Sequence, residues 1–401
     1  MRPLIAALLL ALALPALAQD WTPVSTGTSA TLLSLENGSS SDLYVVGAGG
    51  FALLSDLGRE NWSPFSVGTT ADLYSVVRTS AAEIWFGAGD GRVRHYINSQ
   101  WESPNLPAGQ DYSLFSRGSG TCGAVGSLGD IYSTVDNGDT WDYLGNAGVP
   151  LHAGRGFVTS QFWVVGDQGT ILKTTNGGAS FDVLNSGTTA DLHAFLEGIG
   201  YFAVGENGTI LKSTDAGVTW VPKYSGSAQT LRAISRSGQD AGRLLVVGDA
   251  GTVLRSIDNG ETWCHLDSGT TEDLYSVNMV LNSEYIVTGA NGTLTRTTTG
   301  GGDCISTAAE LPLEPTSSLA LYPNPLRGSG SVRFAAPRAG DYALAVFDVA
   351  GRRLATLERG RLAAGETRDL TLDTRGWSAG VYFLRLDQGD TQVARRFTVL
   401  R

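Results

Sequence analysis

The sequence is short of the residues that build metal and cofactor sites. Its 401 residues include three cysteines, four histidines and two methionines, and lysine occurs only three times. The cysteines form no Cys-x-x-Cys pair, and the histidines (His95, His152, His193 and His265) are too scattered to show ligand spacing. We therefore expect no metal and no cofactor.

Basic residues are also scarce, and they are unevenly distributed. The formal net charge is −11, although the segment from Ser318 onward carries 13 arginines against 8 acidic residues. The rest of the chain is correspondingly more acidic. Since attraction to phosphates supplies most of the affinity for nucleic acid, this balance argues against a nucleic-acid partner.

Long apolar runs are absent after the N-terminus. Arg2, the run from Leu4 to Leu14 and the small residues Ala16 and Ala18 have the three parts of a secretory signal. The run is too short to span a bilayer. We expect residues 1–18 to be a cleaved signal peptide and the mature form to have no transmembrane segment. The protein would then reach the outer cell surface or the medium through the periplasm, where disulfides persist.

One sequence motif, clearest from Val204 to Trp220, is repeated along most of the chain. Its first glycine recurs about every 40 residues, at Gly47, Gly87, Gly126, Gly166, Gly205, Gly248 and Gly289. Seven units of this period predict a seven-bladed β-propeller over residues 19–304, in which each unit is a four-stranded sheet.

Each unit begins with a strand such as Asp72 to Val76, which we expect to face the central axis. A continuous apolar run such as Phe162 to Val165 follows, then a hairpin turn (Gly166 to Gly169) and a third strand. The segment at Trp21 matches the outermost strand of a unit. We therefore expect it to complete the last sheet and close the ring.

The turn after the third strand has a recurring Asp-x-Gly-x-Thr-Trp pattern. It resembles the Asp-box, or bacterial neuraminidase repeat, in which the carboxylate accepts backbone hydrogen bonds across its turn. We expect a structural role for these residues: Asp136 and Trp141, Asp215 and Trp220, and Asp258 and Trp263. The motif is altered in other units, with Asn176 and Phe181 in the fourth.

The repeat as a whole resembles the propeller of the photosystem II assembly and stability factor family. The resemblance covers about residues 21–304 and implies the fold. It implies little about function, because the propeller of that family also occurs in many secreted bacterial proteins unconnected with photosynthesis. The basic patch with which the family binds its photosystem partner has no evident counterpart here.

Two cysteines occupy related places in successive units. Cys264 follows the sixth-unit tryptophan, and Cys304 takes the equivalent tryptophan position in the next unit. A disulfide between them would pin the chain as it leaves the ring, and two independent thiols are the alternative. Cys122 is expected to be a buried, small hydrophobic residue.

The pattern changes after residues 305–317, which we interpret as a linker. About seven short alternating strands over residues 318–401 predict a small immunoglobulin-like sandwich. This segment resembles the type A C-terminal sorting domain of type IX secretion, which implies the secretion machinery as a partner. The residues that carry the resemblance are Tyr322, Pro323, Asn324, Pro325, Gly351, Gly380 and Tyr382. The related immunoglobulin-like domain of flagellar hook-capping proteins is the alternative.

Carboxylates recur at the turns that should meet on one face of the ring. They form a candidate ligand-binding face, consisting of Asp72, Asp90, Asp167, Asp191, Glu206, Asp249 and Asp273. Such a group suits a cation or a basic peptide, although each residue also suits its own turn. Tyr74, Tyr112 and Tyr275 are candidates for stacking on a sugar, although the same positions suit packing between blades.

No nucleophile elbow, phosphate loop or zinc signature is present. We therefore expect a non-catalytic scaffold that binds a protein or a glycan, with no catalytic residues. The alternative is a carbohydrate-active hydrolase of the Asp-box propeller type. Enzymes of that type with two propellers place an acid/base pair in the cleft between them, whereas this sequence predicts one propeller.

Overall fold

The computed structural model is all-β, apart from four short 3₁₀ turns among the residues that it describes. These are residues 20–37, 42–80, 83–97, 100–102, 106–107, 110–118, 120–304, 318–335, 339–349, 351–363, 366–389 and 391–400. The predicted signal peptide (1–18) and linker (305–317) lie outside them. The chain divides into two compact units, Met1–Ser306 and Thr307–Arg401.

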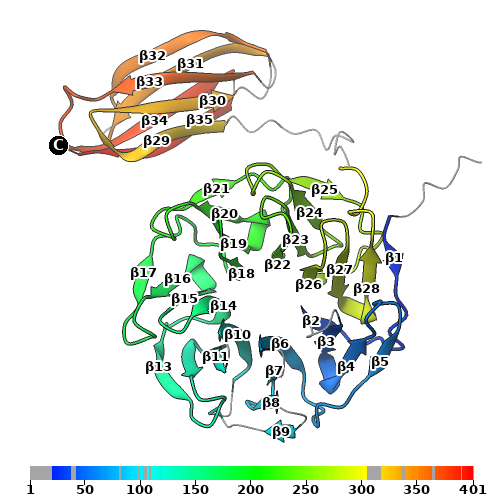
Figure 1. The fold of residues 1–401 in the computed structure, drawn as a ribbon. Coiled ribbons are helices and arrows are strands. Elements are labelled where there is room, and N and C mark those ends of the chain that lie inside the picture. Colours follow the sequence, from blue (N-terminus) through cyan, green and yellow to red (C-terminus); the bar gives the residue numbers. More distant parts are fainter. Residues whose placement is uncertain are drawn as a thin grey trace, which may run out of the picture. The chain divides into compact units, whose positions relative to one another are not determined.

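In the first unit, the described strands form seven four-stranded sheets arranged in a ring (Figure 1). We number the sheets in chain order. The first strand of each sheet is innermost, and consecutive strands pair antiparallel. The inner strands are β2 (Leu32–Asn37), β6 (Leu73–Ser80), β10 (Tyr112–Gly118), β14 (Leu151–Val158), β18 (Leu192–Leu196), β22 (Leu231–Arg236) and β26 (Leu274–Met279).

The two middle strands of each sheet are the most buried, which explains their continuous apolar sequences. The second strands are β3 (Leu43–Gly47), β7 (Glu83–Ala88), β11 (Thr121–Gly126), β15 (Gln161–Gly166), β19 (Tyr201–Gly205), β23 (Leu244–Gly248) and β27 (Tyr285–Gly289). The third strands are β4 (Ala52–Ser55), β8 (Val93–Ile97), β12 (Asp130–Thr134), β16 (Ile171–Thr174), β20 (Ile210–Ser213), β24 (Val253–Ser256) and β28 (Leu294–Thr297).

The outer strand of the seventh sheet comes from the N-terminal end of the described chain. There β1 (Thr22–Pro23) pairs with β28, and the neighbouring Trp21 is buried against Tyr285 with ring centroids 6.3 Å apart. The other outer strands are β5 (Trp62–Pro64), β9 (Gln100–Glu102), β13 (Asp142–Asn146), β17 (Asp182–Leu184), β21 (Val221–Lys223) and β25 (Cys264–Leu266).

Apolar clusters join each sheet to the next around the ring. Between the fourth and fifth sheets, for example, Trp163 stacks on Phe195 with centroids 5.7 Å apart and packs in the same cluster as Ala203. A further cluster joins the seventh sheet to the first, where Ile286 and Leu294 pack with Leu32. The core is thus continuous around the ring, as expected when each repeat buries its faces against its neighbours.

In four of the seven sheets, the turn between the second and third strands is a 3₁₀ turn with two left-handed residues in succession. In η2 (Asp167–Gly169), Gln168 and Gly169 have φ values of 56° and 69°. A Cβ on Gly169 would lie 2.1 Å from the Thr188 carbonyl oxygen, so only glycine fits. Equivalent turns are η1 (Ala48–Gly50), η3 (Glu206–Gly208) and η4 (Ala290–Gly292).

The second unit contains seven described strands in the order β32-β31-β34-β35-β29-β30-β33. Its core includes Phe334, Leu344, Val346 and Phe397, all nearly inaccessible to solvent. The strands are β29 (Ser318–Arg327), β30 (Ser329–Ala335), β31 (Gly340–Asp348), β32 (Arg353–Leu362), β33 (Thr367–Asp373), β34 (Gly380–Gln388) and β35 (Thr391–Val399).

Candidate functional site

Six of the seven inner strands carry a β-bulge at their second residue. In β6, for example, Leu73 pairs with Ala88 and Ser75 pairs with Gly87, which leaves Tyr74 outside the regular register. Bulges re-aim a side chain and are common next to functional sites. The six bulged residues are Leu33, Tyr74, His152, His193, Arg232 and Tyr275.

All six bulged side chains line one cavity of about 320 Å³, which we call the cup. The inner strand of the third sheet has no bulge at this point, because Tyr112 and Ser113 pair in succession with Gly126 and Val125. There Asp111, Ser113 and Ser127 line the cup instead. The residues at this wall therefore differ from sheet to sheet, although the strands that hold them are alike.

Several cup side chains are held in place by carboxylates. His152 Nε2 lies 2.6 Å from Asp167 Oδ1, and the Arg232 guanidinium contacts both Asp249 oxygens through Nε and Nη2. Arg232 also lies over the Tyr275 ring, 5.0 Å from its centroid. These contacts fix the orientation of the cup wall before any ligand arrives.

Tyr74, which also lines the cup, has two carboxylates in its surroundings. Burial, followed by the nearby Asp111 and Asp72 carboxylates, raises the pKa of its phenol. Tyr74 therefore stays a neutral hydrogen-bond donor at any physiological pH.

His193 is the cup residue whose electrostatic environment is most altered. Burial, followed by the neighbouring His152 and Arg232, lowers the pKa of its imidazole to about 4. The rings of His193 and His152 are 4.8 Å apart. His193 is consequently neutral near pH 7, with one ring nitrogen that donates and one that accepts.

The carboxylates predicted to form a ligand-binding face are mostly engaged with the protein itself. Asp72, Asp191 and Asp273 each accept a backbone N–H from a turn of the preceding sheet, at Gly49, Gln168 and Ala250 respectively, over 2.8 to 2.9 Å. The Asp90 carboxylate pairs with Arg94. Glu206 opens the η3 turn. The described residues contain no group of three or more histidine, cysteine or acidic side chains that could hold a metal.

The residues of the Asp-box turns lie away from the cup, between the third and outer strands. Asp215 Oδ1 accepts the Thr219 N–H at 2.8 Å, and its Oδ2 accepts the Thr219 hydroxyl at 2.6 Å. These bonds lower the pKa of Asp215 to about 2. The same pair of bonds occurs between Asp136 and Thr140 and between Asp258 and Thr262.

The tryptophans of these turns cover the contacts between neighbouring sheets. Trp141 meets Trp85 edge to face at 6.0 Å, and Trp220 packs in the cluster between the fourth and fifth sheets. Trp263 packs in the cluster between the fifth and sixth sheets. The turn thus ties the outer edge of one sheet to the core of the ring.

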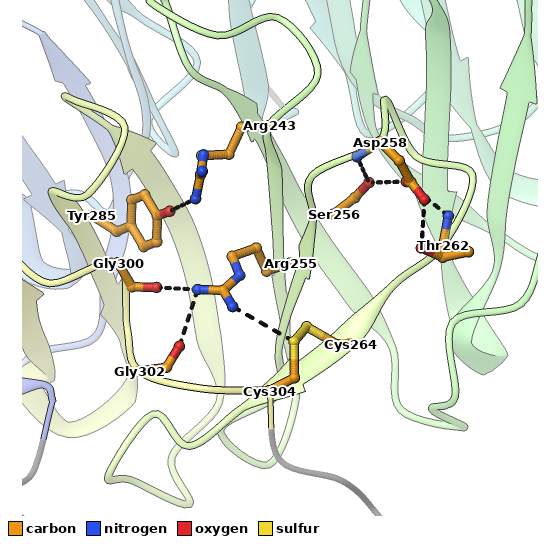
Figure 2. The surroundings of a disulfide bond; sticks show 10 residues. All are labelled: Arg243, Arg255, Ser256, Asp258, Thr262, Cys264, Tyr285, Gly300, Gly302 and Cys304. Carbon is orange, nitrogen blue, oxygen red and sulfur yellow. Dashed lines mark hydrogen bonds between the residues drawn. A yellow bond between two sulfur atoms is a disulfide. The ribbon is translucent and has the colours of Figure 1, made fainter.

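Cys264 and Cys304 form a disulfide at the outer rim, with their Cα atoms 5.5 Å apart (Figure 2). Beside it, Arg255 Nη1 donates to the carbonyls of Gly300 and Gly302 at 2.7 and 3.1 Å. The disulfide and this arginine hold the last described residues of the first unit against the sixth sheet. Cys122 is a buried free thiol on β11.

The residues of the predicted sorting motif lie at several strands of the second unit. The Tyr382 hydroxyl donates to the Ser378 carbonyl at 2.8 Å, and its ring stacks on Phe397. Gly351 has a φ of 76° in the turn between β31 and β32, and Gly380 begins β34. The side chains of Tyr322, Pro323, Asn324 and Pro325, on β29, lie outside the described residues.

Residues 320–400 match the family described as the secretion system C-terminal sorting domain. This tail indicates export to the cell surface or outside the cell, so the expected localisation is confirmed. Among the described helices, none has the length and apolar character needed to cross a membrane. No curated protein is similar enough in sequence to count as a relative.

Solved structures show that the fold is that of a propeller. A structure of YCF48 bound to D1 peptide matches with a TM-score of 0.60 and 19% identity, covering 71% of this chain and 99% of that one. The GH74 enzyme of Niastella koreensis matches with a TM-score of 0.59 and 14% identity, covering 94% of this chain and 67% of that one. The expected resemblance to propellers of the photosystem II assembly factor type is thus confirmed.

PorZ of Porphyromonas gingivalis is a third similar structure, described as an essential bacterial surface component of the type-IX secretion system. It matches with a TM-score of 0.52 and 16% identity and covers 92% of this chain. The chain spans 59% of the PorZ structure. At these identities the three likenesses establish the fold alone.

Proposed function

We propose that this exported protein is a non-catalytic scaffold that binds a protein or a glycan in the cup. The observation that carries the proposal is the convergence of six bulged side chains on one cavity. A bulge interrupts the regular ladder and re-aims its side chain, and here six bulges aim their side chains at the same cavity. Cavities of this size with a few oriented polar groups are the usual form of ligand sites.

We propose further that the seven sheets are the blades of one complete propeller, spanning residues 19–304. The seven-stranded unit over 318–401 would be an immunoglobulin-like sandwich that carries the sorting signal. Pairing of β1 with β28 and the cluster joining the seventh sheet to the first support a closed ring. The strand order of the second unit, with edges at β32 and β33, is compatible with two packed layers.

The neighbouring proteins are consistent with binding. One is a YCF48 structure that contains a peptide, and PorZ is a surface component of a secretion system. The tail makes the type IX secretion machinery a partner during export. These names identify classes of partner, whereas the cup residues decide which ligand fits.

Hydrolysis of a glycan is the second candidate, because a GH74 enzyme shares the fold. Glycosidases usually need two carboxyl groups, about 5 to 9.5 Å apart, across the scissile bond. Among the described residues that line the cup, Asp111 is the one that supplies a carboxylate. This arrangement favours binding over hydrolysis.

Parallel binding and turnover assays on the purified exported protein would test the proposal. A glycan array and a peptide array would be probed with the wild-type protein and with Arg232→Gln. We expect the wild-type protein to bind at least one ligand on the arrays, and the binding signal for that ligand to be lower with the variant. We expect no hydrolysis products from any polysaccharide that binds. Release of reducing ends from a bound polysaccharide would overturn the scaffold proposal, and binding indifferent to Arg232→Gln would move the site elsewhere.

A further inference from the structure

The carboxylates around the cup are already occupied by the protein. Asp167 pairs with His152, and Asp249 pairs with Arg232. Asp191 and Asp273 accept backbone N–H groups of neighbouring turns. Most of the strong acceptors near the cup therefore have a donor, and a ligand rich in donors or positive charge would find few of them free.

Polar groups without a hydrogen-bond partner in the described part of the protein remain on three consecutive sheets. Within the described part of the chain, the His193 ring makes no hydrogen bond, the Tyr275 hydroxyl makes none, and Arg232 uses Nε and Nη2 but not Nη1. These residues are the bulged positions of β18, β22 and β26, so their side chains are neighbours along one arc of the cup. This arc matches a ligand that presents several oxygen acceptors.

The adjoining arc of the cup is largely apolar. Leu33 lies at the bulge of the first sheet, and the phenol rings of Tyr275 and Tyr74 belong to the sheets on either side of it. All three side chains are half-buried. Tyrosines of this kind offer a large ring face together with a polar end. A pyranose ring has a matching form, with C–H bonds on one face and hydroxyl oxygens around its edge.

The negative charge near the cup favours the binding of neutral sugars over acidic ones. Asp72, Asp191 and Asp273 each directly precede an inner strand whose second residue lines the cup, and the unit that carries the cup is strongly acidic. The bidentate contact with Asp249 largely neutralises Arg232. A uronate or a sulfated sugar would therefore meet a negative potential that extends about one Debye length, roughly 10 Å at 0.1 M salt.

We infer that the cup binds the end of a neutral polysaccharide, with sugar oxygens on the His193–Arg232–Tyr275 arc and a ring face against Leu33 and the tyrosines. The inference rests on the proposed function and specifies its ligand class. A cavity of about 320 Å³ has room for one or two sugar rings. The acidic turns act as a filter against anionic glycans.

Calorimetry on the full exported protein would test the inference with defined oligosaccharides. Cellohexaose, mannohexaose and xylohexaose represent neutral chains, and hexagalacturonate represents an acidic one. We expect at least one neutral chain to bind at least tenfold more tightly than hexagalacturonate in 20 mM salt. The difference should narrow in 500 mM salt, because the negative potential is screened.

Two variants locate the sugar. Tyr275→Phe removes one hydroxyl and should weaken binding about two- to tenfold, the usual effect of one hydrogen bond. Tyr224, an exposed tyrosine after the outer strand β21, provides the matched control, since Tyr224→Phe should leave the affinity unchanged. Equal losses in both variants would contradict the assigned arc.

The remaining outcomes separate this inference from the proposed function. Tighter binding of hexagalacturonate at low salt would overturn the neutral-sugar assignment. Binding of a peptide in the cup, with no affinity for any sugar, would overturn the inference while leaving a scaffold that binds protein. Failure of every sugar and peptide to bind would overturn both.

Discussion

The two ends of each repeat differ in how much they vary within this one chain. The Asp-box turn at the outer edge keeps the same bonds in three sheets, whereas the bulged residue at the inner edge is Leu, Tyr, His, His, Arg or Tyr. The first end serves packing, which is the same problem in every sheet. The second faces a common cavity, where unlike side chains create a specific surface.

We call the repeated strands, the turns between them and the disulfide of the first unit the frame. This difference predicts that the frame determines the stability of the first unit, whereas the cup determines which ligand it binds. Substitutions in the frame should lower stability with little direct effect on ligand contacts. Substitutions in the cup should do the reverse. The predictions that follow run from the largest expected effect to the smallest.

Loss of the disulfide should have the largest effect on the frame. Cys264→Ser opens a loop closed across a sequence separation of 40, so we expect the unfolding free energy to fall by about 4 kcal/mol. Urea unfolding without reductant would measure it. Adding reductant should reproduce the loss in the wild type and change nothing further in the variant. A reductant effect of equal size in Cys264→Ser would disprove the assignment to this bond.

A methyl group at the η3 turn should be the next most damaging change. A Cβ on Gly208 would lie 1.9 Å from the Ser227 carbonyl oxygen, and φ is 65°. We expect Gly208→Ala to cost about 3 kcal/mol through the clash and the left-handed backbone. Gly187 has a φ of 75° but nothing within 4 Å of the added Cβ. Gly187→Ala should therefore cost only about 1 kcal/mol in the same unfolding assay.

The Asp-box turns should make the stability of the first unit depend on pH in the acidic range. The pKa of Asp215 is about 2 in the folded protein, below the ordinary value of 3.8. A depressed carboxyl pKa contributes stability that is fully present above about pH 4 and is lost as pH falls towards 2. Thermal unfolding at pH 5, 4, 3 and 2 should show the melting temperature falling across this window.

Asp215→Asn is the matched control for that acid dependence. Asn176 already occupies this place in the fourth sheet, where its Oδ1 accepts the Ser180 N–H at 3.0 Å and its Nδ2 donates to the Ser180 hydroxyl. The variant should keep the turn and lose part of the dependence between pH 4 and 2. An unchanged pH profile would mean that the Asp215 bonds do not contribute to folding.

Cup substitutions should have the smallest effect on stability. His193 makes no hydrogen bond with the described residues and is half-buried, so His193→Ala should change the unfolding free energy by less than about 0.5 kcal/mol. Ligand affinity should fall in the same variant. A loss of stability as large as that of Gly208→Ala would show that the bulged positions belong to the frame.

The frame could be read from the sequence because its physical requirements recur. Apolar runs recur in every repeat, the left-handed turns and the Asp-box bonds recur in several of them, and the segment at Trp21 matches an outer strand. The structure pairs its neighbour β1 with β28 in the seventh sheet.

The cup was harder to predict because a bulge is visible only in the pairing register. The Asp72-Leu73-Tyr74-Ser75 segment and the shorter Asp111-Tyr112-Ser113 segment differ by the one bulged residue, and this difference was the available signal. The carboxylates were singled out instead. Asp167 and Asp249 border the cup, but their charges are paired with His152 and Arg232, which sequence spacing alone does not reveal.

The histidine spectrum measures most directly whether the cup is the binding site, because the chain has only four histidines. His152 and His193 line the cup, whereas His95 is buried against Trp85 and His265 lies on the outer strand β25. In NMR of histidine-labelled protein titrated with the best-binding ligand, we predict shifts of the His152 and His193 ring signals alone. Shifts confined to His265, or binding without any change at His152 and His193, would contradict the account.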